Sequence, residues 1–207
     1  MLFILRILLT MAAEIELKAH VENSEVIKVL LEEKALYSYA FTKEDDYYFS
    51  ALAKDNFPSG VRIRCENRMF ADGTEKNLLF LTYKLKEVVD GIEINDEREF
   101  EIRPSSCQAP VECLASIGFR EFLEKAGFSH GISKKKKGWS FSHDGMTIEL
   151  VEVEGLGWFI ELEILAGSKN NVEQEKKKLL GFLDILGISR SAIESRYYSQ
   201  MLALQAD

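Results

Sequence analysis

Two segments of the chain carry pairs of glutamates separated by one apolar residue. Glu14 and Glu16 flank Ile15, and Glu161 and Glu163 flank Leu162 in the same way. Successive side chains of a β-strand point to opposite faces, so each pair would place two carboxylates on one face. Carboxylate oxygens are suitable ligands for hard divalent cations. The spacing therefore makes both segments candidates for binding a metal ion.

Three other segments place cationic side chains at the same alternate spacing. The pairs are Arg62 with Arg64, Lys84 with Lys86, and either Lys134 with Lys136 or Lys135 with Lys137. One sheet face would then carry cations on some strands and carboxylates on others. Solubility does not require this separation of sign by strand. A polyanion held by Lys and Arg, with a divalent metal held by Glu, does require it.

The composition favours one folded domain and argues against several classes. The chain has 207 residues, 46% hydrophobic and 29% charged, which is sufficient for a single core. The net charge of -8 argues against general nucleic-acid binding. The three cysteines have no metal-ligand spacing and are odd in number, which is typical of reduced thiols in a cytoplasmic protein. None of the three histidines stands in a recognisable nucleophilic motif.

The first residues form a short apolar segment. Residues 1–10 are fewer than the roughly 20 that a membrane span needs, and Arg6 interrupts them. We therefore expect no membrane association and interpret 1–12 as an N-terminal extension, with Met11 as the natural start. A secreted form remains the alternative interpretation. Residues 13–207 are expected to form a single domain.

The sequence predicts eight strands and several helices. The strands are expected at 13–20, 41–52, 61–67, 78–87, 95–102, 133–142, 146–153 and 158–165. The helices are expected at 24–35, 109–117, 119–126, 171–186 and 190–204. An ordinary core cannot accept so many strand charges, because an unpaired buried ion costs several kcal/mol. The expected fold is α+β: a closed, eight-stranded antiparallel barrel with a wet, charged tunnel inside and helices packed outside.

The ordered motifs resemble the CYTH superfamily, also called triphosphate tunnel metalloenzymes. Each motif alone is typical of a solvated strand face, and the resemblance depends on the whole set in order. It begins with the ExExK pattern of 14–18 and extends to Tyr197 and Tyr198. Between them lie 46–49, Arg62 to Arg64, 82–84, the lysine run before Trp139, and 153–157 followed by Glu161 and Glu163.

The resemblance implies a tunnel that binds a triphosphate and Mg²⁺ or Mn²⁺. The metal ligands would be Glu14, Glu16, Glu161, Glu163 and Glu149, with Glu16 and Glu161 catalytic. The phosphate-binding residues would be Lys18, Arg62, Arg64, Lys84, Lys86, Lys134 and Lys136. The lysine register follows from counting back from Trp139. Tripolyphosphate, thiamine triphosphate and ATP are the candidate substrates, and dimerisation through an outer face is left open.

Several positions depart from the family pattern. Val151 stands where an acid is usual; Glu149 shares its face and could substitute, whereas Glu152 would need a bulge. Arg98 alternates with acidic residues, so we leave it out of the site. The His-Phe pair of class IV adenylyl cyclases is absent from 8–11. This favours a triphosphatase, with adenylyl cyclase as the alternative and non-catalytic polyphosphate or nucleotide binding as a third hypothesis.

Overall fold

A computed structural model describes residues 13–50, 59–89, 92–102, 115–166 and 172–205. Within these ranges it leaves out the side chains of 13, 59, 84–87, 95–96, 115–116 and 166. The strands are β1 (Ala13–His20), β2 (Leu36–Ser50), β3 (Ser59–Met69), β4 (Glu75–Val89), β5 (Ile92–Ile102), β6 (Phe128–His143), β7 (Met146–Val153) and β8 (Gly157–Ala166). The helices are α1 (Ser24–Lys34), α2 (Ala115–Lys125), α3 (Val172–Ile185), the 3-10 helix η2 (Arg190–Ala192) and α4 (Tyr198–Ala203).

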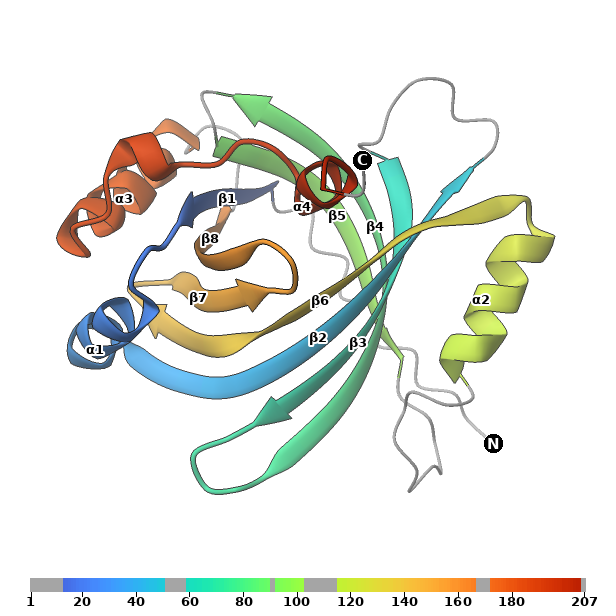
Figure 1. Ribbon diagram of the computed structural model, residues 1–207, viewed down its shortest axis with the longest axis horizontal. Helices are drawn as coiled ribbons and strands as arrows, with labels where there is room; N and C mark the ends of the chain where they lie inside the picture. Colours follow the sequence, from blue (N-terminus) through green and yellow to red (C-terminus); the bar gives the residue numbers. More distant parts are fainter. Residues whose placement is uncertain (1–12, 51–58, 90–91, 103–114, 167–171, 206–207) are drawn as a thin grey trace.

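The strands form one antiparallel sheet in the order β1-β5-β4-β3-β2-β6-β7-β8, which returns to β1 (Figure 1). Consecutive strands from β2 to β5 are neighbours, as are β6, β7 and β8. The two groups meet where β2 pairs with β6 and where β1 lies between β5 and β8. Short β1 is therefore the strand that joins β8 to β5.

The predicted fold class needs correction at two places. A closed eight-stranded barrel was expected, but its closure is incomplete, because β1 pairs with β5 through only three residue pairs, against eight pairs with β8. Strand β5 meets β1 at Glu93, Ile94 and Asn95, whereas it pairs with β4 along its whole length. The helices were all expected outside the sheet. However, the residues that begin α4 line the internal cavity, so this helix covers the interior instead.

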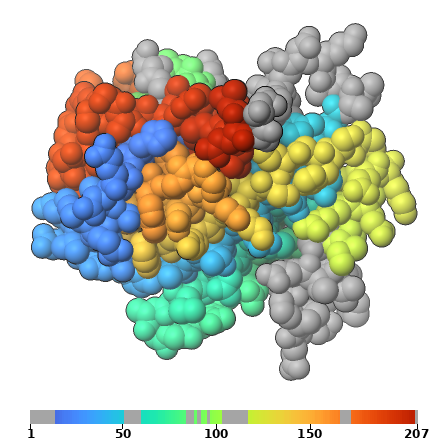
Figure 2. All heavy atoms as spheres, viewed as in Figure 1, coloured from blue at the N-terminus to red at the C-terminus, as the bar shows by residue number. Residues whose placement is uncertain are grey.

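The alternation of β1 separates an apolar outer face from a charged inner face. Ile15 and Leu17 are fully buried among apolar side chains of α1 and α3, whereas Glu14 and Lys18 line the cavity. Burying one such aliphatic side chain contributes about 1.5–3 kcal/mol. The main core therefore lies between the outer faces of β1, β7 and β8 and these two helices. Figure 2 shows the N-terminal elements in blue packed beside the C-terminal ones in red.

A second apolar cluster lies under α2 at the opposite end of the sheet from α1 (Figure 1). Leu123 of α2 packs with Tyr48, Ile63 and Leu79. The sequence predicted a helix at 109–117 that continues through 119–126, and α2 runs without a break through Gly118. The beginning of the first predicted helix, 109–114, lies outside the described residues.

The prediction of one helix at 190–204 was wrong. The segment forms η2 and α4, with extended backbone at Ile193 and Tyr197. Ile193 bridges Ala19 of β1, and the Glu194 amide donates a hydrogen bond to the carbonyl oxygen of Lys18. These strand-like contacts to β1 override the helical propensity of the segment. No helix in the described ranges has the length and apolar character needed to cross a membrane.

Candidate functional site

A cavity of about 280 Å³ lies inside the sheet and is lined by the charged faces of the strands. It is lined by every predicted site residue whose side chain the structure describes: Glu14, Glu16, Lys18, Arg62, Arg64, Lys134, Lys136, Glu149, Glu161 and Glu163. The side chains of Lys84 and Lys86 lie outside the described residues. Their backbones occupy β4, where Lys84 pairs with Gly60 and Glu97. Residues predicted from five separate segments thus meet in one place.

The register of the lysine run on β6 is resolved by burial. Lys134 and Lys136 line the cavity and are only 7% and 6% exposed. The side chains of Lys135 and Lys137 are more than half exposed, and each pairs with a glutamate on the outer face. Of the two alternatives that the sequence left open, the structure selects Lys134 with Lys136.

Lys136 and Glu161 form a buried ion pair. The ammonium donates to both carboxylate oxygens, at 3.0 Å and 2.7 Å, and lies 3.8 Å from Glu149. Burial raises the pKa of Glu161, but the adjacent Lys136 charge outweighs this effect and holds the pKa at about 2. Glu161 is therefore ionised throughout the neutral range, and its charged carboxylate could bind a metal ion.

Lys43 of β2 is a cavity residue that the sequence analysis missed. Its ammonium donates to Glu149 Oε1 at 2.5 Å, and its side chain is only 6% exposed. Burial lowers the pKa of Lys43, and the negative charge of Glu149 offsets part of this shift. A similar buried pair joins Lys18 to Glu93 at 3.2 Å. The cavity thus holds more cations than the predicted set.

Asp45 of β2 was also missed, and it holds two predicted phosphate-binding residues. Its carboxylate accepts hydrogen bonds from Arg64 at 2.6 Å and 3.1 Å, and lies 3.0 Å from the Lys134 ammonium. Burial raises its pKa, but Arg64 and then Lys134 outweigh that effect and hold the pKa well below its usual range. The bidentate contact fixes the orientation of the guanidinium.

Arg62 lies next to this network and keeps one donor available. One terminal nitrogen approaches Glu97 at 3.2 Å, Glu99 at 3.3 Å and Thr82 at 3.2 Å. Its Nε is buried and makes no hydrogen bond with any part of the chain that the structure describes. Because a buried donor without a partner is costly, this nitrogen favours an anionic ligand at the site.

The structure explains why strand β7 carries Val151 where the resemblance leads us to expect an acid. Val151 is fully buried in an apolar cluster with Phe41, Phe159 and two residues of α4, Tyr198 and Met201. A carboxylate here would be buried among these apolar side chains. Glu149 lines the cavity instead.

Glu152 does not replace the missing acid. Strand β7 pairs regularly with β8 and with β6 around it, so the bulge that would turn Glu152 inward is absent from this described segment. Its carboxylate pairs with Lys137 on the outer face, at 2.9 Å.

The carboxylates of the cavity have the right chemistry for Mg²⁺ or Mn²⁺, which prefer oxygen ligands. Across the described ranges, no three His, Cys, Asp or Glu side chains already converge on one point that could hold a metal ion. Mg²⁺ usually keeps several waters and needs only one or two carboxylates together with substrate phosphates. The donor set therefore fits a cation that enters together with an anionic ligand.

Comparison with known proteins identifies the family. The CYTH domain family matches residues 12–198, and the chain belongs to that family. The PH1819 protein of Pyrococcus horikoshii OT3 has 29% sequence identity and a TM-score of 0.76, covering 93% of this chain and 99% of that one.

Two further relatives carry functional names. MJ0240 of Methanocaldococcus jannaschii, named provisionally as an adenylate cyclase, is 24% identical over 196 residues, which cover 92% of this chain and 99% of the relative. HpAC1 from Hippeastrum, named provisionally as an adenylyl cyclase and described as having a dominant triphosphatase activity, is 21% identical with a TM-score of 0.59. The alignment covers 95% of this chain and 96% of HpAC1, and this likeness concerns the fold.

Proposed function

We propose that this protein is a divalent-metal-dependent triphosphatase acting on inorganic or organic triphosphates. The observation that carries the proposal is the cavity, which is lined by lysines, arginines and carboxylates that are buried or only slightly exposed. A triphosphate has several charged non-bridging oxygens, which need cations, and its metal ion needs carboxylates. Membership of the CYTH domain family supports the same interpretation.

Without a ligand, the charges of the cavity neutralise one another. Lys136 is held by Glu161, Lys43 by Glu149 and Lys18 by Glu93. An entering triphosphate would offer oxygen acceptors to these ammonium groups, which would release carboxylates for the accompanying cation. Binding in this scheme exchanges partners and leaves no buried charge unpaired, so the desolvation penalty is limited.

The roles of the cavity residues follow from their charge. Phosphate oxygens would be held by Lys18, Arg62, Arg64, Lys84, Lys86, Lys134 and Lys136. A bound Mg²⁺ or Mn²⁺ would neutralise phosphate charge and orient an attacking water. Its carboxylate ligands would come from Glu14, Glu16, Glu149, Glu161 and Glu163.

In the hydrolytic reaction, water attacks the terminal phosphorus and the bond to the bridging oxygen breaks. The water loses a proton, and the products are orthophosphate and a shortened diphosphate chain. Negative charge grows on the leaving oxygen, and the fixed guanidinium of Arg64 would stabilise it. Glu16 and Glu161 are the proposed catalytic carboxylates, which would hold the reacting groups in line.

A second candidate is adenylyl cyclase activity, which the name of MJ0240 supports. Here the ribose 3′-hydroxyl of ATP would attack the α-phosphorus and pyrophosphate would leave. The same cavity could serve either reaction, because its cations contact phosphate and not the organic group. The third candidate is binding without turnover, which the apolar surroundings of Val151 support.

Substitution of the acidic residues tests the proposal. Glu161→Gln and Glu16→Gln are expected to reduce magnesium-dependent phosphate release from tripolyphosphate at least 100-fold, while circular dichroism shows a folded protein. Glu152→Gln is the matched control, because Glu152 lies on the outer face. Full activity in both cavity variants would contradict the assignment. No turnover by the wild type, together with metal-dependent binding of tripolyphosphate, would favour the non-catalytic candidate.

A further inference from the structure

Tyr198, the first residue of α4, lies beside the cationic part of the cavity. It is 7% exposed and lines the cavity, although the sequence assigned it no role. The centre of its ring is 4.9 Å from the Lys18 ammonium, 5.0 Å from that of Lys134 and 5.7 Å from that of Lys136. One aromatic ring therefore contacts three of the proposed phosphate-binding lysines.

This arrangement offsets repulsion among the lysines. Lys18 comes from β1 and the other two from β6, and their ammonium groups converge although like charges repel one another. The negative face of an aromatic ring attracts a cation within about 6 Å, by about 0.5–2 kcal/mol. The ring of Tyr198 can thus hold the three ammonium groups close to one another before a ligand enters.

The hydroxyl of Tyr198 is a buried donor that faces the carboxylate of Glu161, but it reaches no partner among the described residues with good hydrogen-bond geometry. A buried hydroxyl without a partner is unfavourable, and an acceptor oxygen supplied by a ligand would relieve this cost.

Neighbouring residues hold Tyr198 in place. Its ring packs edge-on against Phe159, with centroids 5.0 Å apart and planes at 81°. Met201, one turn further along α4, is buried in the same cluster. The backbone amide of Tyr197 donates to Gln200 Oε1 at 2.9 Å, which fixes the start of the helix. The hydroxyl is therefore presented from a rigid position.

We propose that Tyr198 is a ligand-binding residue of this cavity: its hydroxyl donates a hydrogen bond to a non-bridging phosphate oxygen, and its ring positions Lys18, Lys134 and Lys136 around that phosphate. This inference rests on the proposed binding of a triphosphate. It adds a neutral donor from the C-terminal helix to a site otherwise built from charged strand residues.

Two substitutions distinguish the contribution of the hydroxyl to ligand binding from that of the ring. Tyr198→Phe keeps the ring and removes the donor, whereas Tyr198→Leu removes both. Calorimetry would measure the binding of imidotriphosphate, a non-hydrolysable analogue of tripolyphosphate, in the presence of Mg²⁺. Tyr83→Phe is the matched control, because Tyr83 is 46% exposed and is not one of the cavity residues. Thermal melts of each variant separate a loss of binding from a loss of stability.

We expect Tyr198→Phe to bind about tenfold more weakly than the wild type. Its melting temperature should be unchanged or higher, because the substitution removes an unpartnered buried polar group. Tyr198→Leu should bind several-fold more weakly again, and Tyr83→Phe should match the wild type.

Wild-type affinity in Tyr198→Phe would overturn the role of the hydroxyl, and equal affinities of the Phe and Leu variants would overturn the role of the ring. Both outcomes leave the proposed function intact. Failure of the wild type to bind imidotriphosphate would instead overturn the proposed function, and this inference with it.

Discussion

The ammonium of Lys136 on β6 lies 2.7 Å from Oε2 of Glu161 on β8, and the pair spans the intervening strand β7. It joins a proposed phosphate-binding residue directly to a proposed metal ligand. The two functional classes of side chain are therefore mixed within the cavity and not confined to opposite walls. Any anionic ligand that reaches Lys136 must compete with a carboxylate.

The two faces of the lysine run make a paired test. Lys136→Met removes a buried cation that contacts Glu161, whereas Lys137→Met removes an outer cation that is 67% exposed. We expect the first substitution to lower kcat/KM for tripolyphosphate by about 10- to 100-fold and the second to leave it unchanged. Steady-state kinetics of both variants provides the comparison. Equal effects would show that Lys136 makes no special contact with substrate.

Asp45 and Asp46 are neighbours with different surroundings. Asp45 is 1% exposed and holds Arg64 and Lys134, whereas Asp46 accepts hydrogen bonds from Arg120 and Ser133 near α2. Asp45→Asn leaves two buried cations undercompensated and should lower the free energy of unfolding by about 3 kcal/mol. Asp46→Asn should cost about 1 kcal/mol or less, because its arginine partner is half exposed.

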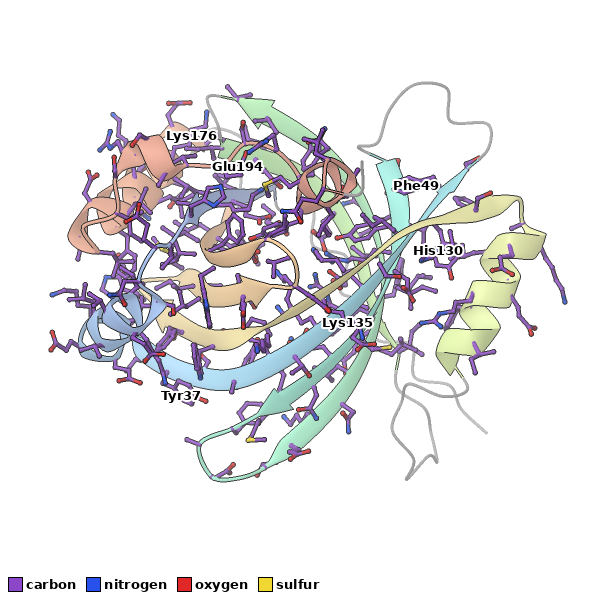
Figure 3. The ribbon with its side chains drawn as sticks, in the orientation of Figure 1. Tyr37, Phe49, His130, Lys135, Lys176 and Glu194 are labelled. Atoms are coloured by element: carbon purple, nitrogen blue, oxygen red, sulfur yellow. The ribbon has the colours of Figure 1, made fainter. Side chains whose placement is uncertain are left out.

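Urea denaturation of the two aspartate variants measures these values directly. A larger loss in Asp46→Asn would contradict the claim that the network inside the cavity is the more important for stability. Asp46 has one further neighbour that belongs to the outer network near α2. This is His130, labelled in Figure 3, whose Nε2 lies 3.5 Å from Asp46 Oδ1.

Val151→Asp tests whether the acid missing from β7 would improve the site. Val151 lies under α4 in an apolar cluster, so the new carboxyl would be buried against apolar side chains. We expect a loss of about 3 kcal/mol in stability and no gain in activity. Val29→Asp on α1 is the control, because Val29 is 54% exposed. Increased metal affinity in Val151→Asp would show that this position faces the metal site.

The stability of the protein should fall at acidic pH through Glu194. This residue lies in the connection between α3 and α4 (Figure 3). Hydrogen bonds from Arg196 lower the pKa of Glu194 to about 2, although burial raises it. A folded-state pKa below the ordinary value of about 4.5 means that the contribution is complete above pH about 4.5 and is lost as the pH falls toward 2.

The expected contribution of Glu194 is about 1–2 kcal/mol, after allowance for the exposure of Arg196. Glu194→Gln should reduce the loss of stability between pH 5 and pH 2, as measured by thermal melts. An unchanged pH dependence in this variant would assign the acid sensitivity to other carboxylates.

Alternation alone was sufficient to assign the two faces of strands in which the charged residues occupy every second position. On β1 and β8 the acidic residues alternate with fully buried Ile15, Leu17, Ile160 and Leu162, so the two faces could be assigned from the sequence. The lysine run left two registers, because all four positions carry the same charge. The resemblance selected Lys134 and Lys136 by counting back from Trp139, and these are the two lysines of the run that line the cavity.

The residues that the sequence missed lie where alternation gives no signal. In β2, Lys43, Glu44, Asp45 and Asp46 are consecutive charges, so no periodicity distinguishes the inner from the outer face. Tyr198 belonged to the ordered motifs but received no role, because only tertiary contacts place a short C-terminal helix over the cavity. The incomplete seam between β1 and β5 likewise depends on strand length and twist and not on residue pattern.

The most direct test of triphosphate hydrolysis is a product assay. The purified protein would be incubated with Mg²⁺ or Mn²⁺ and, separately, with tripolyphosphate, thiamine triphosphate and ATP, and the products resolved by phosphorus NMR. We predict orthophosphate from at least one substrate and none after chelation of the metal with EDTA. Cyclic AMP and pyrophosphate from ATP, without orthophosphate from any substrate, would contradict the triphosphatase assignment and establish the cyclase.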